Sequence, residues 1–394
     1  MTAPRWPITV AMVGGKGLPA TFGGVERVIE EVGARLVARG HRVIVTSRDS
    51  YAGSHTGATH RGMEIVRAPW HLRRKGFDSL SASATGALRV LLASRWRPDV
   101  MHLHGLGVAP LAMFARWCGV RTVAQVHGIE WRNAQWSWPV RRYFRWCEWP
   151  LVRWTDAVAS GGHFDAEGLQ ARHRGAQVVA LPNGVTIPTE TGLMHWRAAH
   201  GRGDFASFAA GRFLLYVGRL VPEKGPQHLL RAFVQAATDG RIPVDVQLVV
   251  VGGSPGRDAF VQQLHQLVPD ALRPRVNFTG FRYEAELLWL WTHAALFVLP
   301  SESEGLALTL LEAMAHRTPT LVSDIRQNTD VTAGLVPQFR AHDVDALAAA
   351  LASALACPPS RLALDAAREH VAAHYSWDRV VDQVEQLYRR VLGA

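Results

Sequence analysis

Residues 294–314 read AALFVLPSESEGLALTLLEAM, and this stretch holds the most information about fold and chemistry. Its apolar run at 294–299 predicts a buried strand, which Pro300 ends. A strongly helix-forming sequence follows the acidic turn, so a helix is expected over 306–316. A helix that begins just after a buried strand can bind an anion, because its first backbone N–H groups have no partner within the helix.

Two carboxylates bracket this turn. Glu304 is expected at the mouth of the helix and Glu312 about two turns inside it. One carboxylate could then meet a ligand directly, while the other reached it from the helix face. Alternatively, Ser301 with Glu304, or Ser303 with Gly305, could simply cap the helix. The acidic pair alone does not decide between a ligand site and a cap.

The composition limits the class of protein. With 394 residues, of which 48% are hydrophobic, the chain is long enough for two domains with separate cores. Its three cysteines are widely spaced, which argues against a disulfide framework and favours a reducing compartment. We expect neither a signal peptide nor a transmembrane helix, since no apolar run reaches about 18 residues. These features predict a cytoplasmic protein, and no Cys/His spacing typical of a metal site occurs.

Positive charge is concentrated in the first half of the chain. Residues 1–190 carry 24 Lys and Arg against 13 Asp and Glu, whereas residues 191–394 carry 19 against 20. A codon bias toward arginine would explain the amount of arginine but not its segregation. The N-terminal half is therefore expected to meet an anionic partner.

Short apolar runs alternate with longer helical patterns in two similar series. This βαβ alternation predicts an α/β fold with two doubly wound, Rossmann-like domains. The first series has expected strands at 8–13, 42–46, 64–68, 100–104, 122–126, 157–160 and 178–181, and helices at 24–39, 80–95, 108–118, 139–154 and 163–172. The second has strands at 213–217, 246–251, 276–279, 296–299 and 320–322, helices at 226–237, 257–268, 284–292 and 306–316, and closing helices at 343–356, 361–374 and 377–392. Between 182 and 204 the periodicity stops, which predicts a linker, and two such halves imply a cleft at the carboxyl ends of both sheets.

Two loops of the first half should open at those strand ends. The glycine-rich stretch from Gly14 to Glu26 follows the first strand and precedes a helix, which suits backbone contact with phosphate. It has neither the dinucleotide fingerprint nor the P-loop spacing, so it could also be no more than a tight turn. His127 ends another strand and is followed by Gly128 and an EWR triplet. A histidine there is often structural, and His104 at the end of the neighbouring strand is the second candidate.

Two loops of the second half complete the set. Arg219 and Lys224 place two cations after the strand at 213–217, where they could bind phosphate oxygens. The alternative is a solvated loop. The other loop is the Glu304–Glu312 element. Together these loops fit a sugar nucleotide. Two cations and a helix N-terminus would bind its diphosphate, and a carboxylate on the helix would bind a sugar diol.

These motifs resemble the family 4 glycosyltransferases, a large group of retaining sugar transferases with the GT-B fold. The resemblance spans nearly the whole chain. It is carried by GGVER at 23–27, HG at 127–128, PNGV at 182–185, YVGR at 216–219 with KG at 224–225, Gly280 after NFT at 277–279, and the seven-residue spacing between Glu304 and Glu312. The pairing of FGGVE at 22–26 with HGIEWR at 127–132 resembles a subgroup of bacterial surface-polysaccharide enzymes that includes rhamnosyltransferases.

The resemblance implies roles for the donor side. Arg219 and Lys224 would neutralise the donor diphosphate and stabilise the leaving nucleotide as the glycosidic bond breaks. Glu312 would bind the ribose hydroxyls, Glu304 would face the donor sugar, and His127 would contact that sugar. The backbone N–H groups that would add to the diphosphate site belong to Gly305, Leu306, Ala307 and Leu308, with Gly23 and Gly24 closing from the other domain.

The resemblance also implies what surrounds this chemistry. Glu130, Trp131 and Arg132 are candidates for the acceptor side. No metal or other cofactor is expected, because no Asp-x-Asp motif occurs and enzymes of this fold act without one. The front-face mechanism proposed for such enzymes uses the leaving phosphate as the base. One departure is Leu306-Ala307-Leu308, where many relatives carry Gly or Phe, so the shape of the sugar pocket is expected to differ.

The resemblance assigns the domains. Residues 1–187 would form the acceptor domain, joined by a C-terminal helix at 377–394 that crosses back to it, and residues 205–376 would form the donor domain. The expected activity is transfer of a hexosyl or deoxyhexosyl group from a nucleotide-diphosphate sugar to a glycan or lipid-linked acceptor. A sugar-nucleotide epimerase with similar domains is the alternative enzyme. A basic nucleic-acid-binding protein, suggested by the pI of about 10.2, is disfavoured because no recognition module is present.

The segment 131–154 combines six tryptophans with arginines at 141, 142, 145 and 153. It predicts an amphipathic basic helix, and Arg73-Arg74-Lys75 adds charge in the same half. Tryptophan at a membrane interface and arginine on lipid phosphates would let this domain rest on an anionic membrane to reach a lipid-linked acceptor. The protein would then be peripheral on the inner face of the cell membrane. The alternative is that the tryptophans are core and the arginines a solvated face.

Overall fold

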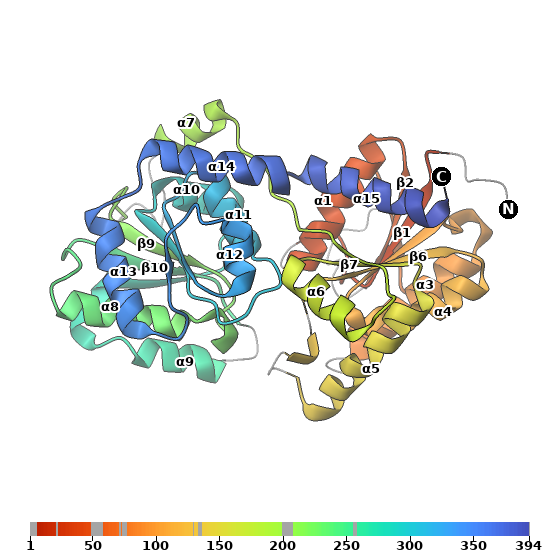
Figure 1. Cartoon of the computed structure of the whole chain (residues 1–394), viewed down its shortest axis with the longest axis horizontal. Coiled ribbons are helices and arrows are strands. Elements are labelled where there is room, and N and C mark those ends of the chain that lie inside the picture. Colours follow the sequence, from red (N-terminus) through yellow and green to blue (C-terminus); the bar gives the residue numbers. More distant parts are fainter. Residues whose placement is uncertain are drawn as a thin grey trace. The chain divides into compact units, whose positions relative to one another are not determined.

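The computed structural model describes residues 6–20, 23–48, 58–70, 72, 77–128, 130–132, 136–198, 208–254 and 258–393. The chain forms two compact units (Figure 1). The N-terminal unit comprises residues 1–184 and 377–394, and the C-terminal unit comprises residues 185–376. Each has its own hydrophobic core, as the composition requires.

The N-terminal unit is built on an eight-stranded sheet in the order β3-β4-β2-β1-β5-β6-β7-β8. All neighbouring strands are parallel except β3 and β4. The strands are β1 Thr9–Val13, β2 Arg42–Ser47, β3 Thr59–His60, β4 Met63–Arg67, β5 Val100–His104, β6 Arg121–Val126, β7 Ala157–Ser160 and β8 Val178–Ala180. The central strands β1 and β5 are buried on both faces, as strands covered by helices on both sides must be, and β5 carries two buried histidines, His102 and His104.

Helices cover this sheet. They are α1 Gly24–Ala38, α3 Phe77–Leu92, α4 Leu111–Trp117, α5 Trp138–Trp154, α6 His163–Arg172 and α15 Trp377–Leu392, with 3-10 turns η1 Ser94–Trp96, η2 Leu106–Val108 and η3 Glu130–Arg132. The last of these helices, α15, packs its apolar face beside α1 in the same core. Arg39, the C-cap of α1, binds Asp382 and Glu385 of α15 at 2.7 and 2.9 Å. The prediction that the C-terminal helix returns to the first domain is confirmed.

The C-terminal unit contains a six-stranded, fully parallel sheet in the order β11-β10-β9-β12-β13-β14. Its strands are β9 Phe213–Val217, β10 Gln247–Val251, β11 Val276–Gly280, β12 Leu296–Leu299, β13 Thr320–Ser323 and β14 Gln338–Phe339. Side chains of β9 alternate between two apolar clusters, with Phe213 and Leu215 in one and Leu214 and Tyr216 in the other. This alternation shows that the sheet is covered on both faces.

Two layers of helices provide that cover, as Figure 1 shows. One cluster includes residues of α10, α11 and α14, and the other includes residues of α8, α9 and α13. The elements are α7 Glu190–Ala198, η5 Pro222–Lys224, α8 Pro226–Thr238, α9 Asp258–Gln266, η6 Asp270–Arg275, α10 Glu284–His293, α11 Leu308–Ala315, α12 Arg326–Thr332, α13 Val344–Ala356 and α14 Arg361–Tyr375. The predicted doubly wound α/β class with two Rossmann-like sheets is confirmed.

The chain passes between the units twice, after Gly184 and after Ser376. These crossings lie side by side, because Val185 and Ser376 form a parallel bridge and the Val185 N–H donates to the Tyr375 carbonyl at 2.7 Å. A side chain at position 184 would meet the Trp377 ring at 2.5 Å, so glycine is needed there.

Four details differ from the sequence prediction. The expected linker at 182–204 contains helix α7, which Arg317 ties to α14 through Glu190 and Asp365. The helix predicted at 108–118 is a 3-10 turn followed by α4, with Pro110 at the N-cap. The helix predicted from 306 begins at Leu308. The short elements β3, β14 and α12 were not predicted.

No single helix in the described part of the chain is long and apolar enough to cross a bilayer, although α13 and α14, bent by 116° to each other, have the necessary length and composition as a pair. The three cysteines are free, with Cys147 buried, Cys118 half-buried and Cys357 exposed.

Candidate active site

The strand order of each sheet determines where a ligand can enter. In the C-terminal unit the order reverses at β9, which lies between β10 and β12. In doubly wound sheets the loops at the carboxyl ends of the strands diverge at this point and leave a crevice for ligands. The loop after β9 carries Arg219 and Lys224, and the loop after β12 carries Glu304. The predicted donor residues therefore flank the switch point.

Lys224 and Glu304 form an ion pair between the two loops. The Lys224 ammonium binds Glu304 Oε2, and the Ser301 hydroxyl donates to Glu304 Oε1 at 2.6 Å. The Glu304 side chain is only 4% exposed and that of Lys224 is 21% exposed. Both carboxylate oxygens of Glu304 thus have a hydrogen-bond partner in a largely buried position, which fixes the carboxylate. The Lys224 ammonium is partly open to solvent.

Gly225 makes this approach possible. Its φ of 69° is left-handed, and a Cβ there would lie 2.0 Å from the Pro300 carbonyl oxygen. The two loops also join through the backbone, because the Glu302 N–H donates to the Glu223 carbonyl at 2.9 Å. The glycine after the lysine is therefore required by the close contact of the two loops, independently of any ligand.

The position of Glu304 rules out the helix-capping alternative. The N-cap of α11 is Ala307, and no side chain caps it. Ser301 binds Glu304 instead of a helix N–H group. Glu304 precedes the first residue of α11 by four positions, and Glu312 is the fifth residue of that helix, about one turn inside it rather than two.

The remaining donor-side residues differ in exposure. Arg219 is exposed, and its carbonyl accepts from the Tyr216 hydroxyl at 2.9 Å. Gly305 and Leu308 are half-buried, whereas Leu306 and Ala307 are buried in the core of the unit. Leu306 and Ala307 can therefore contribute to a ligand site only through their backbone.

The equivalent switch point of the N-terminal unit lies between β1 and β5. Gly23 and Gly24 are exposed at the start of α1, and Gly23 is its N-cap with φ of 105°. Glu26, which is buried, accepts the Lys16 N–H at 3.1 Å and holds the loop onto the helix. Phe22, which belongs to the same predicted motif, lies outside the described residues.

His127 ends a column of three histidines. His102 and His104 stack at 4.3 Å, and His104 Nδ1 lies 3.1 Å from His127 Nε2. At the far end the Tyr388 hydroxyl of α15 lies 2.7 Å from His102 Nδ1. The sequence identified His127 and His104 as candidates, but it gave no sign that His102 and Tyr388 stand behind them.

Burial keeps this column neutral. Desolvation lowers the pKa of His102 to about 3 and that of His127 to about 4, although a hydrogen bond with Asn183 acts to raise the pKa of His127. Burial and the neighbouring imidazoles hold the pKa of His104 well below its usual range. A neutral imidazole at position 127 can exchange hydrogen bonds with a ligand without adding charge.

Two of the predicted acceptor residues, Glu130 and Trp131, make hydrogen bonds within the N-terminal unit. Glu130 Oε1 accepts the Leu106 N–H at 3.1 Å, and burial raises the pKa of Glu130 to about 7. The Trp131 indole donates to Glu148 at 2.8 Å. Arg132 lies in η3, and its side chain is outside the described part of the structure, as is Ile129. Glu130 and Trp131 are thus held by η2 and α5.

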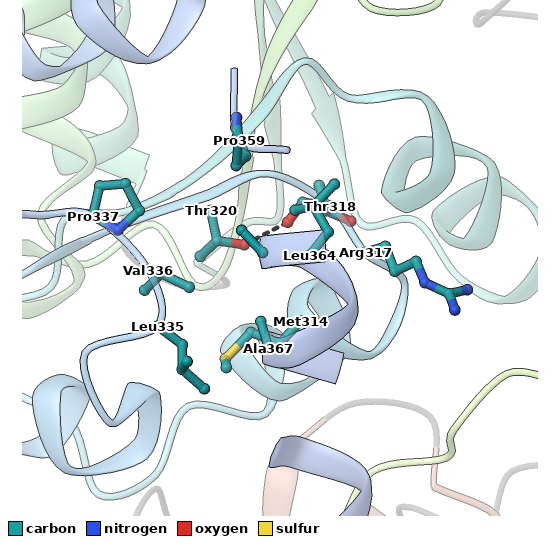
Figure 2. A pocket seen from close by; sticks show the side chains of 11 residues that line it. Met314, Arg317, Thr318, Thr320, Leu335, Val336, Pro337, Pro359, Leu364 and Ala367 are labelled. Atoms are coloured by element: carbon teal, nitrogen blue, oxygen red, sulfur yellow. Dashed lines mark hydrogen bonds between the residues drawn. The ribbon is translucent and has the colours of Figure 1, made fainter. Parts of the chain in front are cut away.

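A small hollow elsewhere in the C-terminal unit is separate from these residues. It lies at the amino end of β13, the opposite end of the strand from the Glu304 edge of the sheet. Figure 2 shows Thr318 and Thr320, joined by a hydrogen bond of 2.8 Å, among its lining residues with Met314 and Val336. None of the predicted site residues lines it.

Comparison with known families agrees with this arrangement. Residues 23–184 match the family model described as "Glycosyl transferase 4-like domain", and residues 202–371 match the one described as "Glycosyl transferases group 1". Together these two matches cover most of the chain, one in each half.

Similar proteins extend along the whole chain. It is 27% identical to the glycogen synthase of Mycobacterium tuberculosis, over 96% of this chain and 94% of that protein. It is 29% identical to the GDP-mannose-dependent alpha-mannosyltransferase of Mycolicibacterium smegmatis, over 98% of each. Alpha-D-kanosaminyltransferase of Streptomyces kanamyceticus is 27% identical, over 93% of this chain and 98% of that protein.

Solved structures support the fold. The sucrose-phosphate synthase of Thermosynechococcus elongatus superposes with a TM-score of 0.73 at 21% identity, covering 98% of this chain and 99% of that one. HepE of Anabaena in complex with UDP-glucose gives 0.75 at 16% identity, covering 96% and 99%. At this level of identity the likeness establishes the GT-B fold.

Proposed function

The chain belongs to the family 4 glycosyltransferases, retaining enzymes that use a nucleotide-sugar donor, and from this premise we propose its substrates. It transfers a hexosyl or deoxyhexosyl group to a glycan or lipid-linked acceptor. The product belongs to a bacterial surface polysaccharide or glycoconjugate, as in the subgroup that the loops after the first strand and after Val126 resemble. The similar proteins have names that point to different donors. The nucleotide base and the sugar of this chain's donor are therefore questions for experiment.

The observation that carries the donor-site assignment is the Lys224–Glu304 pair at the switch point of the second sheet. A diphosphate bound beside Lys224 would take over the ammonium as its counter-ion. Glu304 Oε2 could then accept a hydrogen bond from a hydroxyl of the sugar. The Ser301 hydroxyl would continue to hold Glu304 Oε1 in place. Binding of the donor would thus replace the Lys224–Glu304 ion pair with one between Lys224 and the diphosphate. The Glu304 carboxylate would then be available to the sugar.

The leaving group is the reason for placing cations here. Breaking the glycosidic bond leaves negative charge on the diphosphate, and a cation that is already in position stabilises that charge without reorganisation. Arg219 is exposed and can swing to the same phosphate. His127 of the N-terminal unit offers a neutral polar group, since burial lowers its pKa to about 4.

The test of this site uses a panel of UDP-, GDP-, ADP- and dTDP-sugars, read by thermal shift and by donor hydrolysis. One donor should raise the melting temperature of the full chain. Lys224→Ala and Glu312→Ala should each lose roughly 100-fold or more in donor turnover. Arg231→Ala, at an exposed position of α8, is the matched control and should retain activity. Full activity in both site variants would refute the assignment.

The acceptor side of the proposal rests on the surface of α5. Trp138, Trp146 and Trp149 are 69%, 51% and 52% exposed, so these tryptophans are not core residues. Trp117 of α4 is 71% exposed. Exposed tryptophans interleaved with Arg141, Arg142 and Arg145 have the composition of a surface that rests on an anionic lipid interface. The Arg73-Arg74-Lys75 run lies outside the described residues.

We propose that this surface holds the enzyme at the inner face of the cell membrane, where a lipid-linked acceptor is available. Replacing Arg141, Arg142 and Arg145 with Glu should abolish pelleting with vesicles that contain anionic phospholipid. The charge-matched control replaces three exposed arginines of the C-terminal unit, Arg231, Arg241 and Arg273, with Glu. Unchanged pelleting of the α5 variant, or equal loss in the control, would contradict the membrane proposal.

A further inference from the structure

Three metal-ligating side chains converge at the carboxyl edge of the second sheet, from segments far apart in the sequence. His228 lies in the first turn of α8, Glu302 in the loop after β12, and His342 in the turn after β14. One donor atom from each lies within 4.8 Å of the other two. His228 Nε2 is 2.7 Å from Glu302 Oε1, and His342 Nδ1 is 3.6 Å from the same oxygen.

These separations suit a zinc ion. Zinc binds imidazole nitrogen and carboxylate oxygen at about 2.0–2.2 Å, so tetrahedral ligands stand roughly 3.4 Å apart. The His342–Glu302 separation of 3.6 Å is close to that value, and the His228–Glu302 separation of 2.7 Å is that of a hydrogen bond, which an incoming ion would replace. Small rotations of the side chains would make room for the ion, and the fourth position would hold water, as in other sites with two histidines and one glutamate.

The surroundings hold the central ligand in place. The Glu302 N–H donates to the Glu223 carbonyl at 2.9 Å, and the Gln227 amide donates to Glu302 Oε1 at 3.2 Å. The His228 side chain is 15% exposed, whereas that of His342 is 61% exposed. Two ligands are thus fixed by the fold, and the third closes the site from the solvent side, which gives an ion a route of entry.

The chemistry of the donors selects the metal. Two imidazole nitrogens favour zinc and other late transition metals over Mg²⁺ and Ca²⁺, which prefer oxygen. We propose that His228, Glu302 and His342 form a Zn²⁺ site that joins the loop after β12 to α8 and to the turn before α13. None of the three is among the predicted donor-site residues, although Glu302 lies in the same loop as Glu304.

The experiment measures zinc affinity on the full chain, with any affinity tag removed and the protein treated with a chelator. Zinc chloride is titrated in competition with a chromophoric chelator, and X-ray absorption reports the ligands. Wild-type protein should bind one zinc tightly, with scattering from two imidazoles, and its melting temperature should rise with zinc but not with magnesium. His342→Ala and Glu302→Gln should each weaken binding about tenfold or more.

His374→Ala is the matched control, because His374 is also an exposed histidine of the same unit but lies outside the cluster. It should bind zinc as the wild type does. His342 is exposed, so its replacement should leave the fold intact and a lost affinity can be assigned to the site. Absence of stoichiometric binding in the wild type, or wild-type affinity in His342→Ala, would overturn the proposal. Neither result depends on finding the sugar donor.

Discussion

Lys224 Nζ binds Glu304 Oε2 across two loops that are 80 positions apart in the sequence. The pair places a buried, fixed carboxylate and a partly exposed ammonium at the switch point of the second sheet. Since removing one member of a buried pair leaves the other charge without compensation, the two residues are coupled in stability as well as in the proposed chemistry.

The first prediction separates those two roles. Lys224→Met leaves the buried Glu304 carboxylate without its cation and should lower the free energy of unfolding by roughly 3 kcal/mol. Adding Glu304→Gln removes the stranded charge, so the double variant should regain about 1 kcal/mol or more. Both variants should remain inactive. Urea denaturation combined with donor hydrolysis measures this, and equal instability of the single and double variants would show that the pair is not coupled.

The second prediction concerns the contact between the loops. Gly225→Ala places a Cβ 2.0 Å from the Pro300 carbonyl oxygen and also strains a left-handed residue. The two loops must separate, so the variant should lose roughly 3 kcal/mol of stability and most of its activity. Gly240→Ala is the control, because its φ of 67° is similar but no atom lies within 4 Å of the added methyl. It should cost only about 1–2 kcal/mol and keep activity. Equal effects of the two substitutions would contradict the proposed role of the contact.

The third prediction follows from the histidine column. The folded-state pKa values of His102, His104 and His127 lie below the ordinary value of 6.5, so the unfolded chain binds more protons in acid. Their contribution to stability is complete above pH 6.5 and is lost as the pH falls toward about 4. Over this range each histidine lowers the free energy of unfolding by roughly 1.4 kcal/mol for each pH unit of acidification.

Replacing one member of the column tests this. His104→Phe keeps a ring between His102 and His127 but does not titrate, so its stability should fall less steeply than that of the wild type between pH 6.5 and 4.5. Denaturant titrations at several pH values measure the slope, and the exposed His374→Ala serves as the control. An unchanged slope in His104→Phe would mean that the column is not kept neutral by burial.

Much of the fold could be predicted because most strands are short apolar runs bounded by turn residues, which the unpredicted β3 and β14 are not. The runs at Phe213–Val217 and Val100–His104 form strands with the predicted bounds. Helix α7 was missed, because the proline, glycine and polar residues around it interrupt the apolar periodicity, although the fold buries its Leu193 and Arg317 binds its first residue, Glu190. The start of α11 was predicted two residues early, since Leu306 and Ala307 are residue types that favour a helix. In the structure they lie in the preceding loop and are buried in the hydrophobic core of the unit.

The candidate site was predictable only where motifs lie within one loop. Lys224 and Glu304 each stood out beside a glycine, but their direct pairing depends on the order of β9 and β12 in the sheet, which periodicity does not reveal. The cluster of His228, Glu302 and His342 arises in the same way and has no sequence spacing to signal it. Glu130 was predicted for the acceptor side, and nothing in the sequence indicated that its carboxylate accepts the Leu106 N–H or that burial raises its pKa.

The burial of Glu130 leads to the fourth prediction. Desolvation raises its pKa from 4.5 to about 7, against the hydrogen bond from the Leu106 N–H, which lowers it. Between these values the folded protein holds a proton that the unfolded chain has lost. This contribution to stability is therefore fully present below pH 4.5 and disappears as the pH rises through 7, the opposite direction from the histidine column.

Glu130→Gln keeps an acceptor for the Leu106 N–H but carries no charge at any pH. It should have a stability close to that of the wild type at pH 5 and exceed it at pH 8 by on the order of 2 kcal/mol, because the wild type must then bury an ionised carboxylate. Glu167→Gln, at an exposed position of α6, should stay within about 0.5 kcal/mol of the wild type at both pH values. If the difference between Glu130→Gln and the wild type does not grow with pH, the carboxyl is solvated, and it can then serve the acceptor side as the sequence suggests.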